Sequence, residues 1–171
     1  NDIITGGAGV DNLTGGSGND TYIFNTNDVE TGETITEASN GGTDIVSIIT
    51  NTDFGNMSAS SFDEIETIEF SGASKTATFT SLQMTGETLS LSETVAGTSN
   101  LIIDVGSGET ATFQNITATS SFTSGTDTIT INGSTGNETI IGPNINSTIS
   151  GGIGNDTITG GTEDDTISFN S

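Results

Sequence analysis

The feature that most constrains this chain is a nine-residue repeat that reads Gly-Gly-x-Gly-x-Asp-x-apolar-x. Two units follow each other without insertion over residues 6–14 and 15–23, and four more do so over residues 133–168. Turns between strands do not by themselves need such a strict phase. The repeat therefore predicts a solenoid, in which each unit contributes one turn and one short strand and stacks on its neighbours.

Each position of the repeat has a physical reason. Glycine lets the backbone adopt positive φ and turn tightly, with carbonyl groups pointing into the turn. The apolar eighth residue is expected to face inward from a very short strand; these residues are Leu13, Tyr22, Ile140, Ile149, Ile158 and Ile167. The sixth residue is a carboxylate at Asp11, Asp20, Glu138, Asp156 and Asp165. Carboxylates and convergent carbonyls form an all-oxygen site, which suits a hard cation of the size of calcium.

Two nonapeptides are expected to form one full coil, so alternate loops stack along one edge. The loop at 133–138 should then lie above the loop at 151–156, with a cation between Glu138 and Asp156. By the same rule Asp2, Asp11 and Asp20 are the N-terminal candidates, with Asp2 and Asp20 on one edge.

The opposite C-terminal edge pairs the loop at 142–147 with the loop at 160–165, and its match to the repeat is poorer. Ser147 replaces the carboxylate, Pro143 replaces a glycine, and Glu163 replaces the glycine at the fourth position. We therefore expect the first edge to bind a cation more readily than the second.

The predicted cation ligands are the acidic residues of these loops and the glycines whose carbonyl groups line the turns. They are Asp2, Gly6, Gly7, Gly9, Asp11, Gly15, Gly16, Gly18, Asp20, Asp44, Asp127, Gly133, Gly136, Glu138, Gly151, Gly152, Gly154, Asp156, Gly160 and Asp165.

The nonapeptides resemble those of the RTX family of secreted proteins, and the clear motif covers roughly a third of the chain. The resemblance implies a calcium-loaded parallel β-roll, folding triggered by calcium and export by a type I secretion system. The alternative is turn chemistry without a metal, because Gly, Asn and Asp also form turns between short strands. That alternative stays open above all for the unit at 142–150, which lacks its carboxylate.

The composition is strongly acidic, with 23 Asp and Glu, a single basic residue (Lys75) and a formal net charge of −22. Such a charge repels itself in a compact state unless counter-ions are bound. Low hydrophobicity with high net charge is typical of disorder, but here the acids recur at fixed repeat positions. We therefore expect a chain that is loose without calcium and folded with it.

The same charge argues against binding nucleic acid and against docking on anionic lipid. No apolar run is long enough to cross a membrane, so we expect no direct membrane insertion. We expect no N-terminal signal sequence in this stretch, which opens in the middle of a unit, since residues 1–5 align with residues 155–159. It is therefore expected to be a piece of a longer protein.

Between the two runs the glycine loops fade, and strands of alternating apolar and polar residues take over from about residue 62 to 121. The clearest expected strands are 65–70, 77–80, 88–92, 100–104, 110–114 and 128–131. Thr and Ile favour extended structure, and one apolar face per strand indicates one buried side. Residues 56–63 are the one candidate for a helical turn. The middle resembles, in composition only, the β-solenoid parts of bacterial surface-layer proteins and large adhesins.

The predicted fold class is all-β, a right-handed parallel β-roll or β-solenoid with nonapeptide repeats at both ends. The alternative is a small antiparallel β-sandwich inserted between the two repeat segments. Three segments are expected: N-terminal repeats at 1–24, a divergent middle at 25–121 and a C-terminal roll at 122–171.

Catalysis is not expected. The chain has no His and no Cys, so neither a Ser-His-Asp nor a Cys-His site can be built. The acidic pairs Asp63-Glu64 and Asp164-Asp165 could in principle hydrolyse glycosides. Adjacent residues of a strand point to opposite faces, however, so these pairs are poorly placed.

The leading functional hypothesis is a calcium-dependent structural module of a secreted or cell-surface bacterial protein, such as a surface layer, adhesin or extracellular filament. One alternative is an adhesin domain whose middle binds a sugar or a protein; another is the C-terminal secretion and folding module of a type I-secreted enzyme. The expected partners are calcium and neighbouring copies or adjacent modules, stacked head to tail when calcium is bound. A glycan or other cell-surface partner is a further option.

Overall fold

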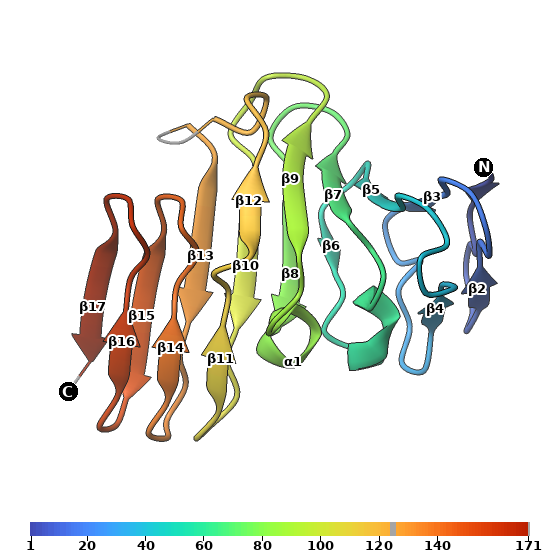
Figure 1. Ribbon diagram of the computed structural model, residues 1–171. Helices are drawn as coiled ribbons and strands as arrows, with labels where there is room; N and C mark the ends of the chain where they lie inside the picture. Colours follow the sequence, from blue (N-terminus) through green and yellow to red (C-terminus); the bar gives the residue numbers. More distant parts are fainter. Residues whose placement is uncertain (124–125, 171) are drawn as a thin grey trace.

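The computed structural model describes residues 1–123 and 126–170, which form a stack of β-coils from one end of the molecule to the other (Figure 1). The strands are β1 (Ile3–Ile4), β2 (Asn12–Thr14), β3 (Thr21–Phe24), β4 (Thr34–Thr36), β5 (Ile45–Ile48), β6 (Thr52–Asp53), β7 (Thr67–Phe70), β8 (Thr76–Thr80), β9 (Leu89–Glu93), β10 (Asn100–Asp104), β11 (Thr110–Thr112), β12 (Ile116–Ala118), β13 (Thr128–Asn132), β14 (Thr139–Ile141), β15 (Thr148–Ile153), β16 (Thr157–Thr159) and β17 (Thr166–Asn170). Two helical turns complete the fold, η1 (Ala59–Phe62) and α1 (Ser81–Met84).

Every strand pair of the described residues is parallel, and two long sheets contain most of the strands. The first long sheet has the order β1-β3-β5-β7-β9-β12, and the second has the order β17-β15-β13-β10-β8-β6. Neighbours in each sheet are separated by a whole coil of chain, because parallel strands cannot be joined by a tight hairpin. This topology confirms the parallel roll and solenoid. The antiparallel sandwich, the alternative for the middle segment, is wrong.

The register confirms that two nonapeptides make one coil. In the first long sheet Ile3 pairs with Thr21, and in the second Thr148 pairs with Thr166, so two repeat units separate the paired strands in both sheets. The middle coils are longer than two nonapeptides, since Ile45 pairs with Thr67. The coil that begins at Asn100 is longer still, because its partner in the next coil is Thr128.

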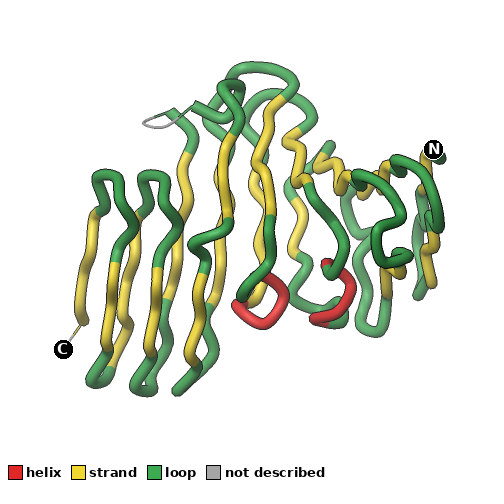
Figure 2. The backbone as a smooth tube through the Cα atoms, in the orientation of Figure 1, coloured by secondary structure: helices red, strands yellow, loops and turns green. Residues whose placement is uncertain are grey.

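The additional residues of the middle coils form a third face, which the sequence did not predict. The N-terminal coils alternate between the first long sheet and the pair β2-β4, whereas the C-terminal coils alternate between the second long sheet and the sheet β11-β14-β16. Between these short sheets, η1 packs against β4 and α1, and α1 packs against β11. Figure 2 shows both helical turns on the same side of the stack. A two-sided roll thus widens into a three-sided prism and narrows again to a two-sided roll.

The two helical turns differ in how well the sequence predicts them. The η1 turn falls within the predicted stretch 56–63. The α1 turn was not predicted; it begins with a capping box in which the Thr80 N–H donates to Gln83 Oε1 over 2.8 Å. Gln83 is itself buried and donates to the carbonyl of Phe54 over 2.8 Å. Among the described residues no helix is long and apolar enough to cross a membrane.

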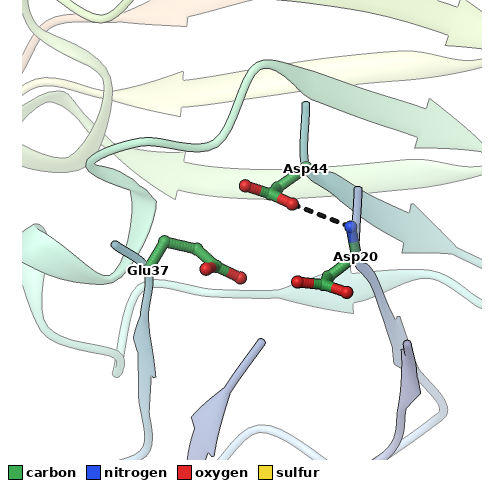
Figure 3. A group of neighbouring side chains, drawn as sticks. All are labelled: Asp20, Glu37 and Asp44. Carbon is green, nitrogen blue, oxygen red and sulfur yellow. Dashed lines mark hydrogen bonds between the residues drawn. The ribbon is translucent and has the colours of Figure 1, made fainter. Parts of the chain in front are cut away.

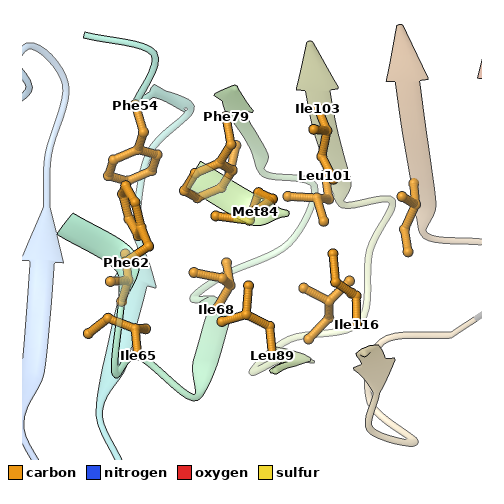
Figure 4. Packing of buried hydrophobic residues seen from close by; sticks show 14 of the residues in the cluster. Phe54, Phe62, Ile65, Ile68, Phe79, Met84, Leu89, Leu101, Ile103 and Ile116 are labelled. Carbon is orange, nitrogen blue, oxygen red and sulfur yellow. The ribbon is translucent and has the colours of Figure 1, made fainter. Parts of the chain in front are cut away.

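One apolar core runs through the whole stack, from Leu13 in the first coils to Ile149 near the C-terminus. Its widest part is aromatic: the rings of Phe54 and Phe79 stack with centroids 4.8 Å apart, and Phe62 meets Phe54 edge-on (Figure 4). The three predicted segments therefore share one core. Residues 124, 125 and 171 of the last segment lie outside the described residues.

The aromatic stack gives a prediction for stability. Phe79→Ala should lower the free energy of unfolding by roughly 3–5 kcal/mol, because it empties a site enclosed by other rings. Urea denaturation in saturating calcium measures this change. Leu82→Ala on α1 is the control, since that side chain is 66% exposed and should change the free energy by less than about 0.5 kcal/mol. Equal losses in the two variants would contradict the packing described.

Candidate metal centres

Acidic side chains at the ends of the loops link each coil to the next. The backbone N–H of Asp2 donates to Asp20 Oδ1 over 2.5 Å, and the N–H of Asp20 donates to Asp44 Oδ1 over 2.8 Å. The N–H of Asp44 continues the series to Glu66 Oε2 over 2.7 Å. One oxygen of each carboxylate is thus held by the preceding coil, and the position of the other oxygen is fixed as a consequence.

Three carboxylates meet at one edge of the N-terminal roll (Figure 3). Asp20, Glu37 and Asp44 each place an oxygen within 4.8 Å of the others. Asp20 and Asp44 directly precede β3 and β5, whereas Glu37 directly follows β4. Asp20 is 0% exposed and Asp44 is 1% exposed, and Asp20 Oδ2 has no hydrogen-bond partner. An all-oxygen group of this kind, with one buried oxygen unsatisfied, fits a calcium ion.

Two neighbouring residues shape this site. The hydroxyl of Tyr22 donates to Glu37 Oε1, and the N–H of Gly16 donates to Glu37 Oε2 over 3.0 Å. Gly15 leaves the space into which the carboxylates converge, since a Cβ atom there would lie 2.6 Å from Asp20 Oδ2. The first residue of the repeat must therefore be glycine, because a side chain there would collide with the carboxylate of its own loop.

The electrostatics of the cluster are unfavourable without a counter-ion. Burial raises the pKa of Asp44, and the charges of Glu37 and Asp20 raise it further, although the N–H of Asp20 and the N-terminal ammonium oppose them. Burial also raises the pKa of Tyr22, and its hydrogen bond to charged Glu37 adds to the shift. The one basic side chain, Lys75, directly precedes β8 and lies outside these coils. A bound divalent cation would remove the like-charge repulsion.

The C-terminal loops at 133–138 and 151–156 stack as predicted. The N–H of Ile153 donates to the carbonyl of Ser134 over 2.7 Å, and the N–H of Glu138 donates to Asp156 Oδ1 over 3.0 Å. Asp156 Oδ2 is buried without a partner, and a Cβ atom at Gly151 would lie 2.6 Å from it. Asp156 thus repeats the geometry of Asp20.

Glu138 behaves differently from Asp156, although the structure brings the two residues together. Its carboxylate accepts from the N–H groups of Gly108, Gly136 and Ser134 at 2.8–3.2 Å. Burial alone would raise the pKa of Glu138, but these donors and the Ser134 hydroxyl outweigh burial and lower it. Backbone donors therefore already satisfy the Glu138 oxygens. That Glu138 and Asp156 share a cation stays a prediction.

The opposite C-terminal edge is closed by hydrogen bonds around Asp165. The N–H and the hydroxyl of Ser147 donate to Asp165 Oδ1 at 2.9 and 2.8 Å, and the N–H of Gly161 donates to Oδ2 over 2.6 Å. Asp127 is satisfied in the same way, by the N–H groups of Ser99 and Thr123 at 2.8 and 2.6 Å.

The remaining predicted ligands are two aspartates of the N-terminal segment and the glycines of the turns. Asp2 is exposed, whereas Asp11 Oδ2 is buried without a partner. Positive φ is found at six of the predicted glycines, namely Gly7, Gly9, Gly16, Gly18, Gly152 and Gly154. At the other predicted glycines a Cβ atom would come closer than 3.0 Å to a neighbouring oxygen; they are Gly6, Gly15, Gly133, Gly136, Gly151 and Gly160.

Sequence reasoning missed two buried or partly buried acids, Glu33 and Glu37. Glu33 precedes Thr34-Ile35 as Asp20 precedes Thr21-Tyr22, so the carboxylate-x-apolar pattern marked its position. Glu37 follows its strand and has no counterpart in the nonapeptide, so only the stacking of the coils shows its role.

Comparison with known protein families agrees with this geometry. The family model of the RTX calcium-binding nonapeptide repeat matches residues 1–23 and 132–167, in four copies. Both ends of the chain are RTX calcium-binding repeats. No curated protein and no solved structure matches the chain.

RTX repeats bind Ca²⁺, and they are typical of extracellular bacterial proteins exported by type I secretion. The resemblance stated from the nonapeptides is thereby confirmed, as is calcium as the cofactor. Asp20 and Asp156 lie within the matched RTX residues, whereas Glu37 and Asp44 lie between them. The N-terminal cluster therefore joins an RTX loop to a coil beyond the repeat.

The raised pKa values predict how the calcium-free chain responds to acid. Folding raises the pKa of Glu33 and of Asp44, in both cases mainly through burial. Protonation therefore favours the folded state: this stabilisation is full below about pH 4 and is lost as the pH rises through the raised values. In a chelating buffer, acidification from neutral pH towards about pH 4 should raise the melting temperature of the N-terminal coils.

Fluorescence of Tyr22 measures this melting locally, because it is the only tyrosine and the chain has no tryptophan. The pKa of Glu138 is lowered, so acid destabilises the C-terminal roll. A probe that reports on the N-terminal coils alone is therefore needed. A Tyr22 melting temperature that falls on acidification without calcium would contradict the electrostatic argument.

Proposed function

We propose that this chain is a calcium-dependent structural module of an exported bacterial protein, in which bound calcium holds successive coils together. The observation that carries the proposal is the cluster of Asp20, Glu37 and Asp44, with an unsatisfied oxygen on fully buried Asp20. Asp20 ends the loop between β2 and β3, and Glu37 and Asp44 stand at the two ends of the loop between β4 and β5, one coil further on. A cation among them would therefore connect the first RTX coil to the next one.

The energetic reason is the charge of the chain. A formal net charge of −22 destabilises any compact state by self-repulsion. A site that binds only the folded state adds about 2.7 kcal/mol at a free calcium concentration of 100 times Kd, and about 4.1 kcal/mol at 1,000 times Kd. Two or three such sites equal the whole stability of an ordinary domain, about 5–15 kcal/mol. Calcium can thus decide whether the coils form.

A structural role fits the composition and the shape better than catalysis does. The chain has no His and no Cys, and each of its buried acids has one oxygen held by a backbone N–H group, as in Asp127 and Glu138. The coils share a single core, which supports a stiff spacer or lattice element. We propose a surface layer, an adhesin or an extracellular filament as the setting, with no enzymatic activity in this chain.

Adjacent modules or neighbouring copies are the proposed protein partners. The last strand of the second long sheet, β17, leaves Ile167 41% and Phe169 61% exposed. Ile167 lies in register with Ile149, which is fully buried one coil earlier. A further coil stacked on β17 would cover Ile167 and pair the free edge of the strand.

Removal of calcium tests the proposal. A chelator should abolish much of the β-sheet circular dichroism and release Tyr22 from its buried site, and added calcium should restore both signals. The measurement is far-UV circular dichroism together with Tyr22 fluorescence during a calcium titration. A spectrum and melting temperature that do not change with calcium would refute the proposed function.

A matched pair of variants shows whether the Asp20–Glu37–Asp44 cluster is responsible for the calcium-dependent folding. Asp20→Asn should raise the calcium concentration needed for the Tyr22 change at least about tenfold, or about 1.4 kcal/mol, because it removes the buried charge. Asp104→Asn removes the same charge from an exposed strand end, where Asp104 only accepts from Asn132 over 2.9 Å. Identical calcium titrations for the two variants would refute the assignment of the site.

A further inference from the structure

Tyr22 is the exception among the inward-facing residues of the nonapeptides. In the first long sheet it lies between Ile4 of β1 and Val46 of β5, which are both apolar. A buried phenol hydroxyl is unfavourable unless it finds a hydrogen-bond partner. Packing of the core therefore does not explain why this position carries a hydroxyl. The eighth residue of the other five units is aliphatic, namely Leu13, Ile140, Ile149, Ile158 and Ile167.

The hydroxyl of Tyr22 reaches from the core to the acidic cluster. The side chain is 0% exposed, and its hydroxyl donates to Glu37 Oε1. A Cβ atom at Gly15 would lie 2.6 Å from Asp20 Oδ2 and 2.7 Å from the Tyr22 hydroxyl. The same Cβ atom would also collide with Glu37 Oε1. The phenol oxygen thus lies beside the carboxylate oxygens of the proposed calcium site.

Glu37 is the carboxylate of the cluster that depends most on this contact. Asp20 Oδ1 and Asp44 Oδ1 each accept a backbone N–H from the preceding coil, so the stack itself fixes these short side chains. Glu37 has a longer side chain, is only partly buried and lies between exposed neighbours in the chain. Its Oε1 accepts from Tyr22, and its Oε2 accepts from the N–H of Gly16 over 3.0 Å. One hydrogen bond at each oxygen fixes the plane of the carboxylate and leaves acceptor capacity for a cation.

We propose that Tyr22 is a positioning residue of this site, whose hydroxyl holds Glu37 where the cluster accepts calcium in preference to magnesium. Calcium takes oxygen ligands at about 2.3–2.6 Å in irregular geometry, whereas magnesium demands about 2.0–2.1 Å and a near-ideal octahedron. The oxygens of Asp20, Glu37 and Asp44 lie within 4.8 Å of one another, a span that one calcium ion can bridge. A carboxylate held at both oxygens cannot move inward to suit the smaller ion. The inference rests on the proposed function and adds what selects the cation.

Titrations of Tyr22→Phe with calcium and with magnesium test the role of the hydroxyl. The amide NMR signals of Thr21 and Ile45, which follow Asp20 and Asp44, report binding at this site alone. The calcium affinity of the full chain should fall about tenfold or more, as is usual when a ligand loses the hydrogen bond that orients it. The magnesium affinity should fall less, so the ratio of the two affinities should decrease.

The ratio separates positioning from a loss of stability. A less stable fold weakens the apparent affinity for both ions by the same factor. Leu13→Val is the matched control: it trims the eighth residue of the preceding unit, which is buried in the same roll, and should leave the ratio unchanged. A Tyr22→Phe chain with an unchanged ratio would overturn the inference and leave the proposed function intact.

A double variant shows whether Tyr22 acts through Glu37. In a Glu37→Ala background the hydroxyl has no carboxylate to hold, so Tyr22→Phe should not change the ratio any further. A further decrease in that background would contradict the assigned role.

A measurement on the wild type covers the case in which Tyr22→Phe does not fold. In calcium, the hydroxyl proton of Tyr22 should give its own NMR signal, protected from exchange with water and with cross-peaks to the Glu37 methylene protons. A hydroxyl proton that exchanges freely with water in the calcium-bound chain would overturn the inference. A wild-type chain that binds no calcium at all would overturn both the inference and the proposed function.

Discussion

The structure depends on one constraint: carboxylates are buried at the ends of tight turns in a chain that has almost no positive charge. The nonapeptide puts an acid where the turn meets the strand, and the first glycine of the unit makes room for it, as Gly15 does for Asp20 and Gly151 does for Asp156. Stacking then places such acids above one another. Each buried carboxylate must be satisfied either by N–H donors or by a cation, because water is excluded.

The two ends of the molecule meet this constraint in different ways. In the C-terminal roll, Glu138 and Asp165 accept several N–H and hydroxyl donors, and of the predicted acids there only Asp156 keeps a buried oxygen without a partner. In the N-terminal roll, Asp11, Asp20 and Glu33 each keep a buried oxygen without a partner. The demand for calcium is therefore greatest in the N-terminal coils, even though the C-terminal part of the chain contains more residues that match the RTX repeat.

The nonapeptide alone predicts the parallel roll, the coil of two repeat units and the stacking of alternate loops, because its period fixes both the turn and the inward residue. Most middle strands follow from alternation, as for β8 and β10. The three-sided middle could not be predicted, since one of its sides is formed by η1 and α1 in the space between β4 and β11. Glu37 was missed because it has no counterpart in the nonapeptide and because it meets Asp20 only through the stacking of coils.

The central claim is that calcium ions balance the buried acids of the N-terminal roll. A crystal structure of the chain grown in millimolar calcium, with anomalous differences collected at long wavelength, tests it most directly. We expect anomalous peaks within calcium–oxygen distance, about 2.3–2.6 Å, of Asp20 Oδ2 and of the oxygens of Glu37 and Asp44. Intact coils with no anomalous density at that cluster, and with its carboxylates bonded only to water or to each other, would contradict the claim.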